Sequence, residues 1–310
     1  MKTLVGLLFL VLNIAWASDL SSVYFSRFKE SSFSASEIKE LKKYKVLLVP
    51  GVLAESFDGQ SGNQIKVGFI FEDAFHEQKA FLTKEKIDFS FAAIDTESPV
   101  EVNALTIISE IEKSQKPVLI YSHSKGGLDT LEALRLRPEL VSKVHGWVSV
   151  QSPFWGSEVA SLMYDNDFLR QTGKSLFEWM GGSAKGMEAL TIKERSRYMD
   201  SADVRLVIKS LDKKLLNYAS YKPNAFGVDT PLEIFRNITQ DLAGNNDGVV
   251  SLKSAMMKEH GLNVNYVIEK NVDHLMTMTK YRPDKLDFLQ KYRAKYDQQR
   301  NTMTLLKMIL

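Results

Sequence analysis

Cysteine is absent from this 310-residue chain, and other signals that would narrow its function are missing as well. Without cysteine there is no disulfide, no thiolate metal ligand and no cysteine nucleophile. The net charge is only +2, with both signs interspersed, so nothing indicates a nucleic-acid partner. With 44% hydrophobic and 25% charged residues, the chain has the composition of a globular protein that is held together by core burial alone.

The apolar run at the N-terminus is too short for an ordinary membrane span. Lys2 precedes an apolar stretch over residues 4–14, and Ala15-Trp16-Ala17 ends it in small-x-small form. A positive start, an apolar middle and a small-residue end are typical of a signal peptide. We therefore expect residues 1–17 to be cleaved and residues 18–310 to form one exported domain, periplasmic or secreted. An uncleaved N-terminal anchor is the alternative.

Short apolar runs alternate with amphipathic segments along most of the chain. The runs predict strands and the segments with helical spacing predict helices. Strands are expected at residues 45–49, 87–94, 118–121, 146–150, 204–208 and 266–268, and helices at 35–43, 72–84, 99–114, 128–136 and 283–295. The alternation is expected to resume at 231–238, and the apolar tail at 303–310 to pack on the core. This order predicts an α/β fold with a mostly parallel sheet and helices on both faces.

Residues 118–129 carry the strongest functional signal. Residues 118–121 are apolar without alternation, as in a strand that is covered on both faces. Small residues then flank Ser124, with Ser122 two positions before it and Gly126 two positions after it, and a helical pattern follows. A strand, a crowded turn with a serine and a helix form the nucleophile elbow of hydrolases. Ser122 stands where the usual pattern has glycine. The stretch resembles the elbow of lipases of the α/β-hydrolase superfamily.

A serine nucleophile needs a base and an orienting acid, and in that fold they follow the serine in the order acid, then histidine. Four of the five histidines do not fit: His76 precedes the serine, His123 adjoins it and should point away, and His145 and His260 come just before strands. His274 follows the last predicted strand and is the expected base. The expected acid is Asp247, whose turn is similar to the Asp-Gly-x-Val segment of bacterial triacylglycerol lipases, with Asp241 as the alternative.

The resemblance to bacterial lipases and esterases extends over residues 45–275 through five short motifs in the same order. It implies an oxyanion hole from the backbone N–H groups of Lys125 and Val52, with Pro50 in place of the lipase histidine. Residues 151–157, Gln-Ser-Pro-Phe-Trp-Gly-Ser, are similar to the segment that leads into the lipase lid. Some such lipases hold calcium through an aspartate shortly after the histidine. That aspartate is missing here, so we expect no metal and no cofactor.

Residues 157–230 interrupt the alternation and are rich in methionine, aromatic residues and glycine. We predict several short helices that form a cap, or lid, over the site, although a plain core role for the apolar residues is an alternative. The predicted substrate-binding residues are Leu53, Trp155, Trp179, Met180 and Leu275.

These features together predict a serine hydrolase that cleaves carboxylic esters through an acyl-enzyme, with a Ser124-Asp247-His274 triad. The expected substrate is a lipid ester, with transient contact to a lipid interface. Two alternatives stay open at this point. One is an acyltransferase or thioesterase with the same triad. The other is a catalytically silent binding protein on the same fold, for which Ser122 and Pro50 are the support.

Overall fold

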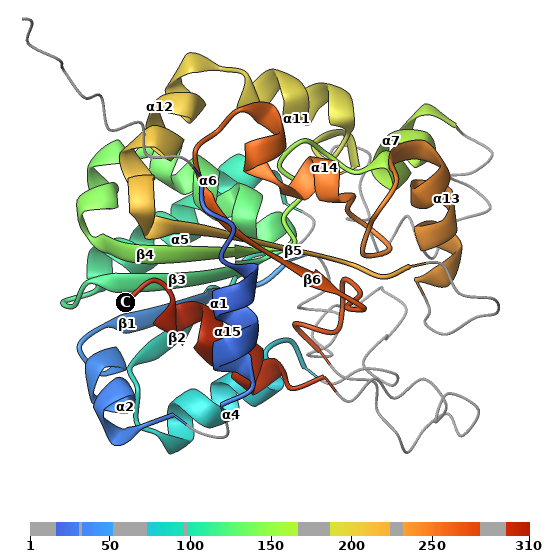
Figure 1. Ribbon diagram of the computed structural model, residues 1–310. Coiled ribbons are helices and arrows are strands. Elements are labelled where there is room, and N and C mark those ends of the chain that lie inside the picture. The colour runs from blue at the N-terminus through green and yellow to red at the C-terminus, as the bar shows by residue number, and fades with distance from the viewer. Residues whose placement is uncertain are drawn as a thin grey trace, which may run out of the picture.

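Six parallel strands form one sheet in the order β2-β1-β3-β4-β5-β6 (Figure 1). The computed structural model describes residues 17–30, 33–51, 73–95, 98–166, 187–223, 232–279 and 296–310. The strands are β1 (Lys45–Val49), β2 (Phe89–Phe91), β3 (Val118–His123), β4 (Val144–Val150), β5 (Leu215–Tyr221) and β6 (Asn265–Lys270). The parallel sheet with helices around it confirms the predicted α/β fold class.

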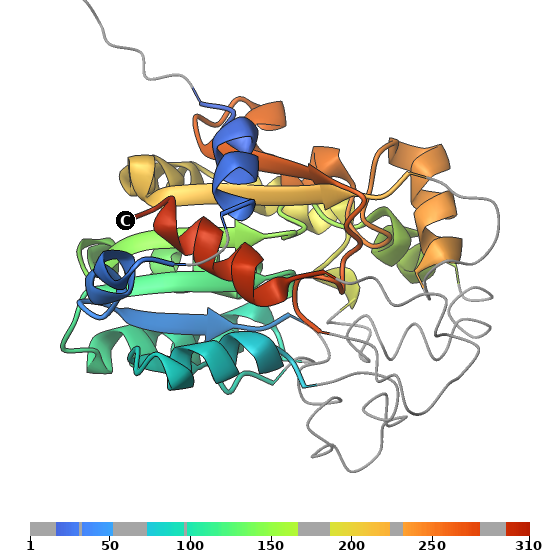
Figure 2. The same ribbon diagram turned by 60° about the horizontal axis from the view of Figure 1, so that its bottom comes forward.

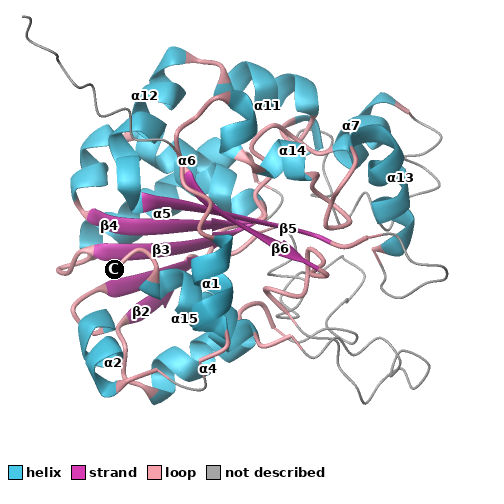
Figure 3. Ribbon diagram, in the orientation of Figure 1, coloured by secondary structure: helices cyan, strands magenta, loops and turns pink. Residues whose placement is uncertain are grey.

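Helices cover both faces of the sheet (Figures 1 and 3). One face carries α5 (Val100–Lys113), α6 (Lys125–Leu136) and α12 (Ala202–Leu211). The other carries α1 (Ser21–Phe28), α2 (Ala35–Leu41), α4 (His76–Lys84) and α15 (Gln298–Lys307). The remaining α-helices among the described residues are α7 (Glu158–Asp165), α11 (Ile192–Met199), α13 (Glu233–Ala243) and α14 (Leu252–Ala255). None of the described helices combines the length and apolarity needed to cross a membrane.

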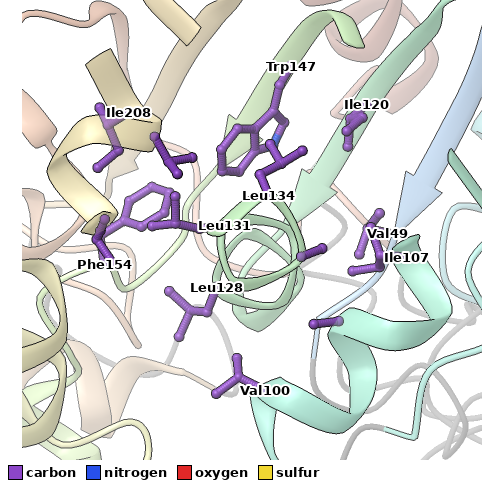
Figure 4. Packing of buried hydrophobic residues seen from close by; sticks show 14 of the residues in the cluster. Val49, Val100, Ile107, Ile120, Leu128, Leu131, Leu134, Trp147, Phe154 and Ile208 are labelled. Atoms are coloured by element: carbon purple, nitrogen blue, oxygen red, sulfur yellow. The ribbon is translucent and has the colours of Figure 1, made fainter. Parts of the chain in front are cut away.

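Alternate residues of the central strands β1 and β3 enter two separate hydrophobic clusters, because successive side chains of a strand point to opposite faces. In β1, Leu47 and Val49 face α5 and α6, whereas Val46 and Leu48 face the other layer. Figure 4 shows the first cluster, in which Leu128, Leu131 and Leu134 of α6 pack between residues of the strands and neighbouring helices. Burial on both faces explains why residues 118–121 read as an unbroken apolar run.

The order of the strands places a topological switch point between β1 and β3. The chain leaves β1 for β2 on one side and then returns to β3 on the other side of β1. In open parallel sheets a crevice forms outside the carboxyl ends of the strands at such a point, and ligands bind there. Gly51 follows β1 and Ser124 follows β3, so both lie at this switch point.

The two edges of the sheet differ. β2 is an edge strand of only three residues. At the opposite edge, residues 18–20 run parallel to β6: Tyr266 N donates to Ser18 O at 3.1 Å, and Leu20 N donates to Tyr266 O at 2.8 Å. The following helix α1 packs beside α15, so segments from the two ends of the described chain lie side by side (Figure 2).

The middle of the sequence prediction needs a correction. The segment 204–208, expected as a strand, belongs to helix α12. Where the alternation was expected to resume, the chain forms helix α13 from Glu233 onward. Val204, Val207, Ile208 and Leu211 are buried, whereas Leu206 is 65% exposed, so the apolar residues form one helical stripe. The fifth strand is β5, at residues 215–221.

The strand expected at 87–94 is shortened to β2, and the helix expected at 72–84 begins only at His76, whereas several other features agree with the prediction. Helix α6 ends at Leu136, Ser34 and Glu37 form the expected capping box of α2, and Met303, Leu305 and Leu306 of α15 are buried on the core. Residues 1–16 of the expected signal peptide, the expected helix at 283–295, and residues 167–186 and 224–230 of the expected cap lie outside the described residues. The cap therefore stays a prediction.

Candidate active site

Ser124 occupies a strained turn between β3 and α6. Its backbone has φ 54° and ψ −129°, a conformation that residues other than glycine seldom adopt. Ser124 N donates to Val150 O of β4 at 2.9 Å, which ties the turn to the neighbouring strand. A Cβ at Gly126 would lie 2.3 Å from Pro50 O and 2.6 Å from Val49 O, so the chain can pass here only without a side chain. The turn thus has the geometry of a nucleophile elbow.

Ser122, which replaces the usual glycine of the elbow pattern, fills a specific place in the core. It is fully buried in β3, and its Oγ accepts a hydrogen bond from Trp147 Nε1 at 2.8 Å. Trp147 lies in β4 and is also fully buried. Because a buried indole N–H needs an acceptor, the serine at this position satisfies a group that glycine would leave unpaired.

The structure brings Ser124, His274 and Asp247 into one hydrogen-bonded chain. His274 Nε2 lies 2.9 Å from Ser124 Oγ, and His274 Nδ1 lies 2.9 Å from Asp247 Oδ2. Since an ionised carboxylate can only accept, the ring carries its proton on Nδ1 and turns the Nε2 lone pair toward the serine hydroxyl. All three residues are at least 90% buried, and Ser124 is 8% exposed.

Asp247 is held at this place by the turn that contains it. Its Oδ1 accepts hydrogen bonds from Val249 N at 3.0 Å and Val250 N at 2.8 Å, which leaves Oδ2 for His274. The backbone N of His274 also donates to Asp247 O at 2.9 Å. The alternative acid, Asp241, lies at an exposed position of α13. Of the two candidates, Asp247 is therefore the carboxylate beside the histidine.

Two backbone segments meet at the serine where an oxyanion hole would form. Lys125 is the first residue of α6, and the first N–H groups of a helix have no partner within it. A Cβ at Gly51 would lie 2.6 Å from Ser124 Cβ, so the loop after β1 passes directly against the nucleophile. Val52, the expected second donor, follows Gly51 and lies outside the described residues.

The side chain of Lys125 does not face solvent, which the sequence did not suggest. It is 2% exposed, and its Nζ binds both oxygens of Asp129 at 2.9 and 3.1 Å. Asn103 Nδ2 of α5 donates to the same carboxylate at 3.1 Å. Burial raises the pKa of Asp129 to about 6 despite the nearby ammonium. The pair fixes the first turn of α6, and its signal in the sequence is the spacing of a lysine and an aspartate four residues apart.

The imidazole of His123, the residue before the nucleophile, contacts His274. Its Nε2 lies 2.8 Å from the carbonyl oxygen of His274 and therefore donates to it. The two rings lie 4.8 Å apart between centroids. Complete burial, and then repulsion from His274, lower the pKa of His123 from 6.5 to about 3, so its ring is neutral at pH 7.

Two solved structures that share the fold of this chain are an esterase and a lipase. A metagenomic carboxyl esterase superposes with a TM-score of 0.67 at 19% identity, over 86% of this chain and 76% of the other. The mature form of a Bacillus licheniformis lipase gives 0.56 at 20% identity, over 75% of this chain and 85% of the other. The chain has the α/β-hydrolase fold. No protein-family model matches its sequence, and the search of curated proteins likewise gave no match.

On this α/β-hydrolase fold, the structure describes two of the five predicted substrate-binding residues. Trp155 is 5% exposed and stacks on His260, with 3.6 Å between the ring centroids, and Leu275 is 3% exposed. Leu53, Trp179 and Met180 lie outside the described residues. The substrate-binding assignments stay predictions. Within the described ranges, no three histidine or acidic side chains cluster as metal ligands would.

Proposed function

We propose that this protein is a serine hydrolase that cleaves carboxylic esters through an acyl-enzyme. One observation carries the proposal: His274 stands 2.9 Å from Ser124 Oγ and 2.9 Å from the carboxylate of Asp247. This geometry suits proton transfer from the serine to the imidazole, with the carboxylate stabilising the imidazolium. The structural neighbours described above, a carboxyl esterase and a lipase, agree with an ester substrate.

In the proposed reaction, Ser124 Oγ attacks the ester carbonyl carbon while His274 Nε2 takes the hydroxyl proton. The backbone N–H of Lys125, aided by the positive end of α6, stabilises the charge on the carbonyl oxygen, and Val52 is the expected second donor. The C–O bond then breaks, and the alcohol leaves with the proton from His274. Water attacks the acyl-enzyme as His274 takes its proton, and the carboxylic acid departs as Ser124 is reprotonated.

A fluorophosphonate probe tests this proposal, because it forms a covalent adduct only with an activated serine. The native protein should label, and Ser124→Ala should not, with the fold unchanged because only a hydroxyl is removed. Ser161→Ala, which removes a half-buried serine hydroxyl of α7, is the matched control and should label normally. Absence of labelling in the native protein would leave the silent binding protein as the better description.

We further propose that the substrates are lipid esters with long acyl chains. The support is the content of methionine and aromatic residues in the sequence at 167–186, which suits an apolar acyl-binding wall; the described methionines Met163, Met187 and Met199 belong to the hydrophobic core instead. The rate constant kcat/KM for p-nitrophenyl esters should rise from acetate to palmitate, and Trp179→Ala/Met180→Ala should flatten the profile. A profile that falls with chain length in both proteins would describe an esterase for small substrates.

A further inference from the structure

The loop that carries His274 is buried although it has no regular structure. Residues 272–279 follow β6, and all of them are buried. A buried backbone carbonyl that lacks a hydrogen-bond donor is costly, and an irregular loop cannot supply donors from a helix or a strand ladder. The partners of these carbonyls therefore decide how firmly the loop, and with it the imidazole, is held.

Three buried glutamines from separate elements donate to these carbonyls. They are Gln151 after β4, Gln78 of α4 and Gln298 of α15, and each is at most 1% exposed. Their Nε2 atoms donate to Asp273 O, to Thr277 O and to both Met276 O and Thr279 O, respectively. With His123 donating to His274 O, Phe75 N to Met278 O, and Met278 N and Thr279 N to Leu275 O, every carbonyl from residue 273 to 279 has a partner.

Gln151 differs from Gln78 and Gln298 because it forms hydrogen bonds with loop residues on both sides of His274. Its Nε2 donates to Asp273 O at 3.0 Å, and its Oε1 accepts from Thr277 Oγ1 at 2.6 Å. The second Nε2 proton goes to Ser220 Oγ of β5 at 2.6 Å. The Asp273 carbonyl can only accept, which fixes the orientation of the amide. All the polar groups of this side chain are thus engaged in holding the histidine loop to the strands.

The residue before Gln151 helps to position the nucleophile. Val150 O accepts the backbone N–H of Ser124 at 2.9 Å, and Gln151 is the next residue. Gln151 has φ 51°, a backbone conformation that a residue with a side chain adopts only when its surroundings impose it. Two consecutive residues at the end of β4 therefore set the position of the serine backbone and of the histidine loop relative to each other.

We propose that Gln151 is a positioning residue that sets the distance between His274 Nε2 and Ser124 Oγ. The inference rests on the ester-hydrolase function proposed above. Because Gln151 is fully buried, we expect it to act through the loop and not by binding the substrate. Its loss should lower kcat and leave KM unchanged, because a misplacement of about 1 Å at reacting groups costs on the order of 10²-fold in rate.

The decisive variant is Gln151→Met, which keeps the shape of the side chain and removes the donor and the acceptor. We expect kcat to fall roughly 10- to 100-fold with KM unchanged. Thr277→Val, which removes one of the bonds to Gln151, should lower kcat less, and it decides the question if Gln151→Met does not fold. The matched control is Asn217→Leu on β5, which removes a buried amide that accepts from Met257 N at 3.0 Å, away from the histidine loop.

Gln151→Glu separates positioning from a general loss of stability. A buried carboxyl has a raised pKa, and its protonated form regains one O–H donor for Asp273 O. The ratio of its kcat to that of the native protein, taken at each pH, should therefore fall as pH rises. Asp273, His274 and His123 are the titratable groups beside this position. Division by the native kcat removes the pH dependence that the variant and the native protein have in common. Gln151→Met should show no recovery at low pH.

Two results distinguish failure of this inference from failure of the proposed function. Native protein that labels with the probe while Gln151→Met keeps kcat within about twofold, or loses no more than Asn217→Leu, would overturn the positioning role alone. Native protein that does not label would overturn the hydrolase. In that case hydrogen exchange of residues 272–279 still decides the structural claim: exchange should be faster in Gln151→Met than in Asn217→Leu, and equal rates would overturn it.

Discussion

The serine and the histidine of the site are held in place by two different kinds of structure. Ser124 sits between a strand and a helix, where backbones pass so closely that Gly126 and Gly51 have no room for a Cβ. His274 sits on an irregular buried loop, whose carbonyls depend on side-chain donors. The serine half of the site is therefore sensitive to added atoms, and the histidine half is sensitive to lost hydrogen bonds.

The largest effect is expected at the acid beside the histidine. In Asp247→Asn, Oδ1 can still accept from Val249 N and Val250 N, but the amide would donate to His274 Nδ1 and force the wrong tautomer. We expect turnover to fall about 10⁴-fold, as in the serine protease precedent for this change. Steady-state kinetics measure it, with Asp241→Asn as the exposed control that should stay near the native rate. The opposite ranking would move the acid to Asp241.

The serine half is tested by adding a single methyl group. In Gly126→Ala the new Cβ would meet Pro50 O at 2.3 Å and Val49 O at 2.6 Å, and neither backbone oxygen can move without shifting β1. We expect the free energy of unfolding to fall by about 3 kcal/mol or more, by urea denaturation. Gly261→Ala is the control: it has φ 75° and nothing within 4 Å, so it should cost only about 1–2 kcal/mol. Equal losses would show that crowding does not shape the elbow.

His123 joins the two halves, because it precedes Ser124 and donates to His274 O. Its pKa is about 3 in the folded protein and near 6.5 in the unfolded chain, so the unfolded chain binds more protons between these values. The free energy of unfolding should therefore fall as pH falls below 6.5, by roughly 3 kcal/mol at pH 4. His123→Gln keeps a donor at a similar reach but cannot titrate, so this part of the acid sensitivity should disappear. Urea denaturation at pH 7 and pH 4 measures it, and an unchanged difference between the two pH values would contradict the assignment.

The sequence predicted the serine half of the site more fully than the histidine half. The strand, the turn and the helix around Ser124 are local, and their pattern of small and apolar residues is legible in one stretch. His274 and Asp247 could also be selected, by their order and by the turn around Asp247. Their support could not be, because Gln78, Gln151 and Gln298 come from distant segments and carry no periodic signal.

The fold shows the same limit. The strands that bracket the site were predicted from short apolar runs, whereas the segment 204–208 was misread because five successive residues with three β-branched side chains suit a strand as well as a helix. Only the longer spacing, which extends to Leu211, separates the two. Strand β5 was missed because Asn217 and Ser220 interrupt its apolar character, and both are buried by hydrogen bonds that only the folded chain supplies.

The pairing of residues 18–20 with β6 has a consequence for self-association. An open strand edge offers unpaired N–H and C=O groups to any other extended chain, and proteins protect such edges by shortness or by cover. The edge strand β2 is protected by its shortness. The edge at β6 is covered only after residues 18–20 pair with it. These residues are far from β6 in the sequence: Ser18 and Asn265, which are hydrogen-bonded, lie 247 positions apart. Until that contact forms, the β6 edge is a template for aggregation, and conditions that keep the N-terminal segment away from the sheet prolong this period.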